Sequence, residues 1–161
     1  MGQYYKIVNP AKQQYLHPHC FGDGLKLLEF GSSSMGTLLG LTILLADGNG
    51  RGGGDIRSSS AVVGSWAGDP VVITGDYAEN GRFLSAADLL DYKEQGNEGV
   101  PTLYSAAHEM YENISFKVIR ALCEDPFFRE KFKQRLSDGC SFGMQENMKK
   151  MDPALFAELI G

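Results

Sequence analysis

Cysteine, histidine and tryptophan are scarce in this chain, whose 161 residues include three cysteines, three histidines and one tryptophan. The cysteines are Cys20, Cys123 and Cys140, and no two of them stand at CxxC spacing. The sequence therefore supports neither a disulfide framework nor a zinc knuckle, because both need regularly spaced pairs. We expect free thiols, as is typical of a protein in the reducing cytoplasm.

Long hydrophobic runs are missing as well. The longest apolar stretch, residues 35–46, covers about twelve residues, whereas a membrane-crossing helix needs about twenty. The opening residues MGQYYK contain no apolar segment of the kind found in secretory signals. These absences predict a cytoplasmic protein without a membrane segment.

A strong excess of charge of one sign is also absent. The formal net charge is −5, so the chain has no overall attraction to phosphate, and we expect no nucleic-acid partner. Hydrophobic residues make up 43% and charged residues 22% of the chain, which is typical of a folded globular protein. The length corresponds to one domain.

Glycine, in contrast, is abundant and unevenly distributed. Of twenty glycines, fifteen fall in residues 1–81 and five in residues 82–161. Glycine concentrates in turns, whereas the second half shows the apolar spacing and the start and stop residues of helices. We therefore predict a single α+β domain over residues 1–161, with helices packed on a small antiparallel sheet. Residues 1–83 form its mixed half of hairpins and a glycine-rich loop, and residues 84–161 its helical half.

Two β-hairpins are expected in the first half. Residues 3–8 and 13–17 are rich in aromatic and β-branched side chains and flank the favoured turn sequence NPAK. Residues 61–66 and 71–76 flank the sequence AGDP in the same manner. Between the two hairpins, the apolar residues 35–46 fit either a helix or a buried strand.

Capping residues predict where helices begin. The serines at 32–34 can cap a helix formed by the following apolar run, and Ser85 can cap another. Asp125 and Asp152 are each followed by proline, and an N-cap aspartate with proline at the first helical position is a strong helix start.

The glycine-rich segment DGNGRGGGD, residues 47–55, is the first candidate for a binding site. Its Gly48-x-Gly50-x-x-Gly53 spacing matches the dinucleotide pattern, but no helix opens out of the loop, as that pattern requires. Consecutive backbone N–H groups here can form an anion-binding nest, and the alternative is a flexible connector. The candidate ligand-binding residues are Gly50, Arg51, Gly52, Gly53, Gly54, Asp55, Arg57, Trp66 and Asp69.

A metal site is the second candidate, at the sequence HPHCFGD. In extended backbone, residues two apart share a face, so His17 and His19 can approach one metal ion, and Asp23 can complete the site. The alternative is a proline-stiffened turn in which both histidines bond to the backbone. Aspartates also follow glycine in three other turns, at Asp55, Asp69 and Asp76, and these turns can meet at one end of the sheet.

The segments MGQYYKIVN, YLHPHCFGDGLKLLEF, GRGGGDI and VVGSWAGDPVVITGDY together resemble a family of small uncharacterised bacterial and phage-type proteins. The resemblance covers residues 1–77. It implies a prokaryotic or viral cytoplasmic setting, and it places the glycine-rich loop and the GSWAGD turn in one module. It implies no activity, cofactor or catalytic residue.

No complete catalytic motif is present, and Ser65 lies one position away from the place that a GxSxG elbow requires. We therefore expect a non-catalytic binding or interaction protein that holds a small anionic ligand or a protein partner at the glycine-rich surface. The first alternative is a metal-dependent hydrolase that uses His17, His19 and the turn aspartates. The second is a phage-type antagonist or immunity protein that acts by covering its partner.

Overall fold

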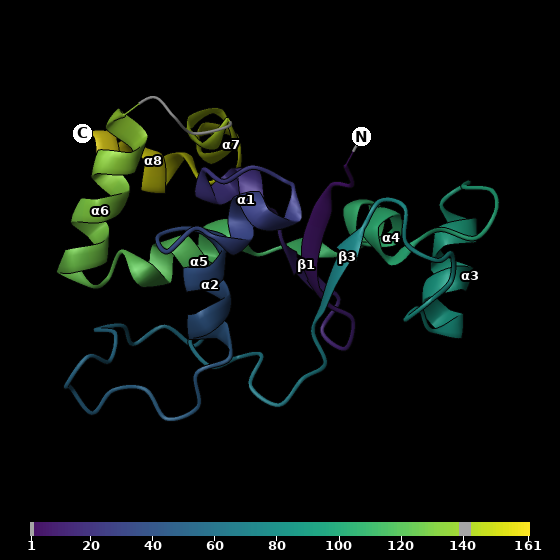
Figure 1. Ribbon diagram of the computed structural model, residues 1–161, viewed down its shortest axis with the longest axis horizontal. Coiled ribbons are helices and arrows are strands. Elements are labelled where there is room, and N and C mark those ends of the chain that lie inside the picture. Colours follow the sequence, from purple (N-terminus) through teal and green to yellow (C-terminus); the bar gives the residue numbers. More distant parts are fainter. Residues whose placement is uncertain (1, 139–142) are drawn as a thin grey trace.

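The computed structural model describes residues 2–138 and 143–161 and shows an α+β fold with a helical C-terminal half, as predicted (Figure 1). The strands are β1 (Tyr5–Asn9), β2 (Gln14–Leu16), β3 (Val72–Gly75) and β4 (Glu112–Asn113). The helices are η1 (Pro18–Phe21), α1 (Leu27–Gly31), α2 (Thr37–Leu44), α3 (Ala86–Glu94), α4 (Leu103–Met110), α5 (Ser115–Leu122), α6 (Pro126–Ser137), α7 (Met144–Met151) and α8 (Pro153–Ile160).

The strands form one sheet in the order β3–β1–β2–β4. The hairpin of β1 and β2 is confirmed, and the Lys12 N–H donates to Asn9 Oδ1 across its turn at 3.0 Å. β3 pairs antiparallel with the other side of β1. The sheet is mixed rather than purely antiparallel, because β4 pairs parallel with β2. This parallel pairing is possible because α3 and α4 carry the chain from β3 back to the far edge of the sheet.

The prediction of a second hairpin, formed by residues 61–66 and 71–76, is wrong. Residues 61–68 form a run of turns, and β3 pairs with β1 instead. The Gly64 N–H donates to the carbonyl of Ile43 at 2.8 Å, and the Trp66 N–H donates to the carbonyl of Leu44 at 2.9 Å. These bonds satisfy carbonyl groups at the C-terminal end of α2, which have no partner inside the helix. The segment therefore closes α2 instead of forming a strand.

Both faces of β1 are buried because the sheet lies between two hydrophobic clusters. Ile7 belongs to the larger cluster, which includes Trp66 and residues of η1, α2 and α5 to α8. Val8, on the opposite face, belongs to a smaller cluster with residues of α4. Cys20 and Cys123 are buried free thiols, as expected, while Cys140 lies outside the described residues.

The apolar run 35–46 forms a helix, α2, but its serine caps are not used. The N-cap position is Gly36, and the Thr37 N–H and Oγ1 both donate to Asp23 Oδ2 at 2.7 Å. A carboxylate from a distant turn thus supplies the contact that the sequence assigned to residues 32–34. Gly40, inside α2, allows close packing, because a Cβ there would lie 2.9 Å from the ring of Phe21.

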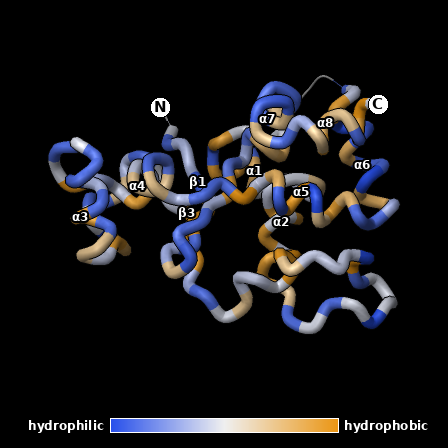
Figure 2. The backbone as a smooth tube through the Cα atoms, turned by 180° about the vertical axis from the view of Figure 1, so that it is seen from behind, coloured by the Kyte–Doolittle hydropathy of each residue, from blue (hydrophilic) through white to orange (hydrophobic). Residues whose placement is uncertain are grey.

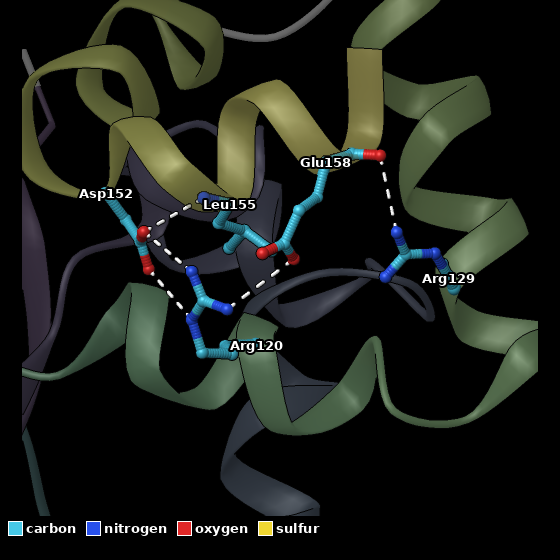
Figure 3. A network of polar contacts seen from close by, with 5 residues as sticks. All are labelled: Arg120, Arg129, Asp152, Leu155 and Glu158. Carbon is cyan, nitrogen blue, oxygen red and sulfur yellow. Dashed lines mark hydrogen bonds and ion pairs between the residues drawn. The ribbon is translucent and has the colours of Figure 1, made fainter. Parts of the chain in front are cut away.

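The other expected helix starts are confirmed. Ser85 caps α3, and Asp125 caps α6 by accepting from the Phe127 N–H at 2.9 Å. Asp152 caps α8 and also accepts two hydrogen bonds from Arg120 of α5, at 2.8 and 3.2 Å (Figure 3). This aspartate therefore joins the last helix to the centre of the helical half. α7 was not predicted by any pattern in the sequence.

Candidate functional site

The glycine-rich segment and the residues that follow it, residues 47–59, form an ordered loop, which we call the glycine loop. Asn49 closes it through two hydrogen bonds of 3.0 Å, with Nδ2 donating to the carbonyl of Ile56 and Oδ1 accepting from the Ile56 N–H. Inside this closure, Asp55 Oδ2 accepts from the N–H groups of Gly50 at 2.9 Å and Arg51 at 2.8 Å. Two consecutive N–H groups thus bind one carboxylate oxygen, which is the geometry of an anion-binding nest.

The glycine loop is also tied to the connection between α5 and α6. The Arg57 N–H donates to Asp125 Oδ2 at 2.9 Å, while Oδ1 of the same aspartate caps α6. The Ser58 hydroxyl and the Ser59 N–H both donate to Glu124 Oε2. The sequence marks Asp125 only as a helix cap and gives no sign that Glu124 contacts the loop. Their contacts with the loop join residues more than 60 positions apart, so no local pattern could show them.

A cavity of about 780 Å³ lies along the glycine loop. Its lining residues are Gly50, Gly52, Gly53, Gly54, Asp55, Ile56, Arg57, Ser58, Ser59 and Glu124. A Cβ atom added at Gly52 or Gly53 would meet nothing within 4 Å, but both residues have positive φ angles, 81° and 61°. Glycine is therefore needed here for the path of the backbone, and the peptide groups stay uncovered by side chains.

The two predicted ligand-binding residues outside the loop lie elsewhere. Trp66 is fully buried in the larger cluster, and its Nε1 donates to Gln14 Oε1 at 2.8 Å, so it presents no surface to a ligand. Asp69 accepts from Asn9 Nδ2 and forms an ion pair with Lys12 Nζ, both at 2.9 Å. The hydrogen bonds from Asn9 and Lys12 lower the pKa of Asp69. The turn that holds both residues therefore fastens the first hairpin and does not line the cavity.

His17 and His19 lie side by side, with ring centroids 5.3 Å apart. The His19 N–H donates to His17 Nδ1 at 3.2 Å, and His17 is the N-cap residue of η1. Burial lowers the pKa of His17 to about 4, and the nearby positive charge of Lys6 acts in the same direction. His17 is therefore neutral near pH 7, and its Nδ1 is occupied by a backbone bond, as in the turn that the sequence offered as the alternative.

Asp23, the third predicted metal ligand, is bound by protein groups that do not include the two histidines. It is buried, and besides its two bonds from Thr37 its Oδ1 pairs with Arg135 of α6 at 2.7 Å. Over residues 2–138 and 143–161, no three histidine, cysteine, aspartate or glutamate side chains are grouped so that they could hold a metal ion. The predicted set of His17, His19 and Asp23 is thus not assembled as a metal site.

The four aspartates of the Gly-Asp turns each have different partners. Asp23 bonds to Thr37 and Arg135, Asp55 to its own loop, and Asp69 to the first hairpin. Asp76 accepts from the Tyr4 N–H at 3.0 Å. Each carboxylate holds one turn to a neighbouring segment, and no shared arrangement for acid–base chemistry results.

The two described thiols are poor candidates for nucleophiles. Burial raises the pKa of Cys20 to about 11 and that of Cys123 to about 12. A cysteine reacts as the thiolate, so a raised pKa makes both side chains inert near neutral pH.

Lys6 is a buried lysine that sequence analysis did not single out. Its Nζ lies 3.5 Å from the ring centroid of Tyr104, on α4, in a cation–π contact. Burial lowers its pKa to about 8, although the charge of Asp76 acts in the opposite direction. Lys6 lies on the face of β1 that packs against α4. The sequence gives no sign that this face is buried, so the burial of Lys6 could not be inferred from it.

Comparison of the chain with known protein families, curated proteins and solved structures gives no match. None of the helices in the described parts of the chain is long and apolar enough to span a membrane. The resemblance of residues 1–77 to small bacterial and phage-type proteins stays a prediction.

Proposed function

We propose that this chain is a non-catalytic binding protein that holds a protein partner at the surface of the glycine loop. The cavity of about 780 Å³, whose lining includes the bare peptide groups of four glycines, carries this proposal. Uncovered peptide groups can hydrogen-bond to the backbone of a second protein at close range. Catalysis, in contrast, needs reactive side chains that can act on a substrate, whereas the two carboxylates that line the cavity, Asp55 and Glu124, are bound by N–H and hydroxyl donors of the loop itself.

The shape of the glycine loop supports binding because it is fixed in advance. The Asn49–Ile56 closure and the contacts with Glu124 and Asp125 hold both ends of the segment. A segment that is already ordered loses less conformational entropy when it binds, and this raises affinity.

The charges at the cavity favour a protein partner over a small anion. Asp55 already occupies the nest formed by the Gly50 and Arg51 N–H groups, and the carboxylate of Glu124 lines the same cavity. An anionic ligand, the other predicted occupant, must displace the first carboxylate and tolerate the second. If the Gly50 and Arg51 N–H groups can bind an anion once Asp55 is removed, Asp55→Ala should bind inorganic phosphate and the wild type should not.

The test compares two pairs of glycines with the same backbone conformation. Gly52→Asn and Gly53→Asn add side chains over the cavity, and asparagine tolerates the left-handed conformation better than most residues. The matched control is Gly96→Asn with Gly99→Asn, two positions with φ of 88° and 77° and no atom within 4 Å of an added Cβ.

Tagged proteins are used to capture partners from a lysate of the source organism. We expect one stoichiometric protein with the wild type and the control, and its loss with the cavity variant at unchanged melting temperature. Equal capture by all three refutes the proposed surface. A captured enzyme that loses its activity when bound would support the occlusion mechanism.

A further inference from the structure

The outer edge of β3 is an unpaired strand edge. The Tyr5 N–H donates to the carbonyl of Leu25, away from β3. Because the backbone N–H and carbonyl groups of a strand alternate in direction, those of Lys6 and Val8 point toward β3, where they pair with Thr74 and Val72. The N–H and carbonyl of Ile73 therefore point away from β1. Within the described residues, no turn or loop hydrogen bond involves the Ile73 backbone. Its side chain is 43% exposed.

A cavity of about 350 Å³ runs beside this edge, and all four residues of β3 line it. Its other lining residues are Gln3, Tyr5, Ala78, Glu79, Arg82, Phe83 and Leu103. Phe83 has a φ of 65°, a conformation that is rare for a bulky residue, and its ring is half exposed beneath the guanidinium of Arg82. The edge thus combines free backbone groups with a neighbouring apolar hollow.

The segment that follows β3, residues 76–102, is acidic and exposes apolar side chains. Its residues Ala78, Glu79, Arg82 and Phe83 line the cavity beside the edge, whereas α3 lies on the far side of α4 (Figure 1). It carries six acidic and two basic residues, a formal charge of −4 within a chain of net charge −5. Of the twelve large hydrophobic residues that are exposed in the described parts of the chain, five lie in β3 or in this segment: Ile73, Tyr77, Phe83, Leu90 and Val100. Apolar surface surrounded by negative charge is complementary to a partner that is apolar and basic.

This surface is separate from the glycine loop. Figures 1 and 2 show the glycine loop and α3 toward opposite ends of the molecule, with β3 between them. A partner at the edge of β3 can therefore bind without covering the cavity of the glycine loop.

We infer that the edge of β3 is a docking strand for an extended basic and apolar segment of a partner protein, which adds a fifth strand to the sheet. In such an addition, backbone hydrogen bonds give affinity and alternate side chains enter neighbouring pockets. Here the Ile73 backbone supplies the bonds and the cavity takes an apolar side chain. The carboxylate of Glu79, which lines the cavity, and the negative charge of the segment that follows β3 attract the basic side chains. A second copy of this chain fits the same edge poorly, because both copies are acidic, with a net charge of −5 each.

The probe is a fluorescent Lys-Val-Lys-Val-Lys-Val-Lys peptide, with a Glu-for-Lys peptide and a backbone N-methylated peptide as controls. We expect the Ile73 amide to exchange with solvent faster than the Thr74 amide in the free protein, and to become protected when the lysine peptide is added. Binding should weaken with salt, because it depends partly on charge. Neither control peptide should protect Ile73.

Two substitutions at one position separate the backbone from the side chain. Ile73→Pro removes the outward N–H together with the isoleucine side chain, at a position where proline is tolerated in an edge strand, and should weaken peptide binding about tenfold. Ile73→Thr keeps the N–H and should bind within about threefold of the wild type, since it loses only part of one apolar contact. The inference is overturned if the lysine peptide leaves Ile73 unprotected, if Ile73→Pro binds as well as Ile73→Thr, or if the free protein is a dimer that protects Ile73.

Discussion

Asp23 is expected to be the aspartate whose removal destabilises the fold most. It is 4% exposed and accepts from the Thr37 N–H, the Thr37 hydroxyl and Arg135. Removing one partner of a buried ion pair costs about 3–5 kcal/mol, and losing a helix cap costs about 1 kcal/mol. Because the Arg135 side chain is 25% exposed and can be partly rehydrated, we expect Asp23→Ala to lose about 3–4 kcal/mol of unfolding free energy.

The measurement is urea unfolding of Asp23→Ala beside Asp76→Ala, a control from another Gly-Asp turn. Asp76 accepts one exposed hydrogen bond from the Tyr4 N–H, so its loss should cost less than about 1 kcal/mol. At about 2–4 °C per kcal/mol for a chain of this size, Asp23→Ala should melt roughly 10 °C below the wild type.

A double-mutant cycle with Arg135→Ala then isolates the ion pair. We expect a coupling of about 1.5 kcal/mol or more, because the two side chains are in direct contact. If Asp23→Ala costs no more than Asp76→Ala, the structural role given to Asp23 is incorrect. A rise in melting temperature with Zn²⁺ that Asp23→Ala abolishes would instead support the metal site predicted from the sequence.

Three further predictions concern the core and the helical half. Arg120→Ala should lower the free energy of unfolding by at most about 1 kcal/mol, because its ion pairs are half exposed. Asp152→Ala should lower it by about 1–2 kcal/mol, because this change also removes the cap of α8. Chemical denaturation of both variants shows whether Asp152→Ala is the less stable. The pKa of lysine is 10.5 in the unfolded chain, whereas that of Lys6 in the folded protein is about 8. Between these pH values the unfolded state therefore binds more protons at Lys6 than the folded state does. Lys6 should therefore add stability across that range, whereas Cys20 and Cys123, whose pKa values are raised by burial, act in the opposite direction above pH 9. The test is the difference between the wild type and Lys6→Met, which should shift by about 2–3 kcal/mol in favour of the wild type over a pH series of urea melts. Gly40→Ala should lose about 1 kcal/mol despite its better helix propensity, because the added methyl group meets the Phe21 ring at 2.9 Å; a stability gain in urea unfolding would contradict this packing.

The elements that local chemistry defines were predictable. Asp125 and Asp152 mark helix starts because the cap and the following proline act within one turn, and the NPAK turn fixes the first hairpin for the same reason. The second hairpin failed because residues 61–66 are apolar enough for a strand, but Gly64 is held at φ 76° against the end of α2. Apolar content alone does not say which distant backbone groups a segment will satisfy.

The candidate site shows the same division. The composition of residues 47–55 indicates a loop and leaves open whether it is an anion-binding nest or a flexible connector. In the structure, two N–H groups of this loop bind Asp55 from within the loop itself. The contacts with Glu124 and Asp125, and the burial of Trp66, depend on how the two halves of the chain pack together. These contacts join residues with no relation along the sequence, so neither periodicity nor motif spacing could reveal them.

The central place of β1 in the sheet has a consequence for the order of synthesis. β1 leaves the ribosome before its neighbour β3, which lies about 70 residues later, and before β4, which closes the far edge of the sheet at residues 112–113. The Arg135 that pairs with Asp23 follows 112 positions after it. The nascent first hairpin must therefore wait, with both faces uncovered, until most of the chain has been made. Non-local pairing of this kind slows folding and exposes strands to aggregation, so chains truncated before α5 should depend on chaperones to stay in solution.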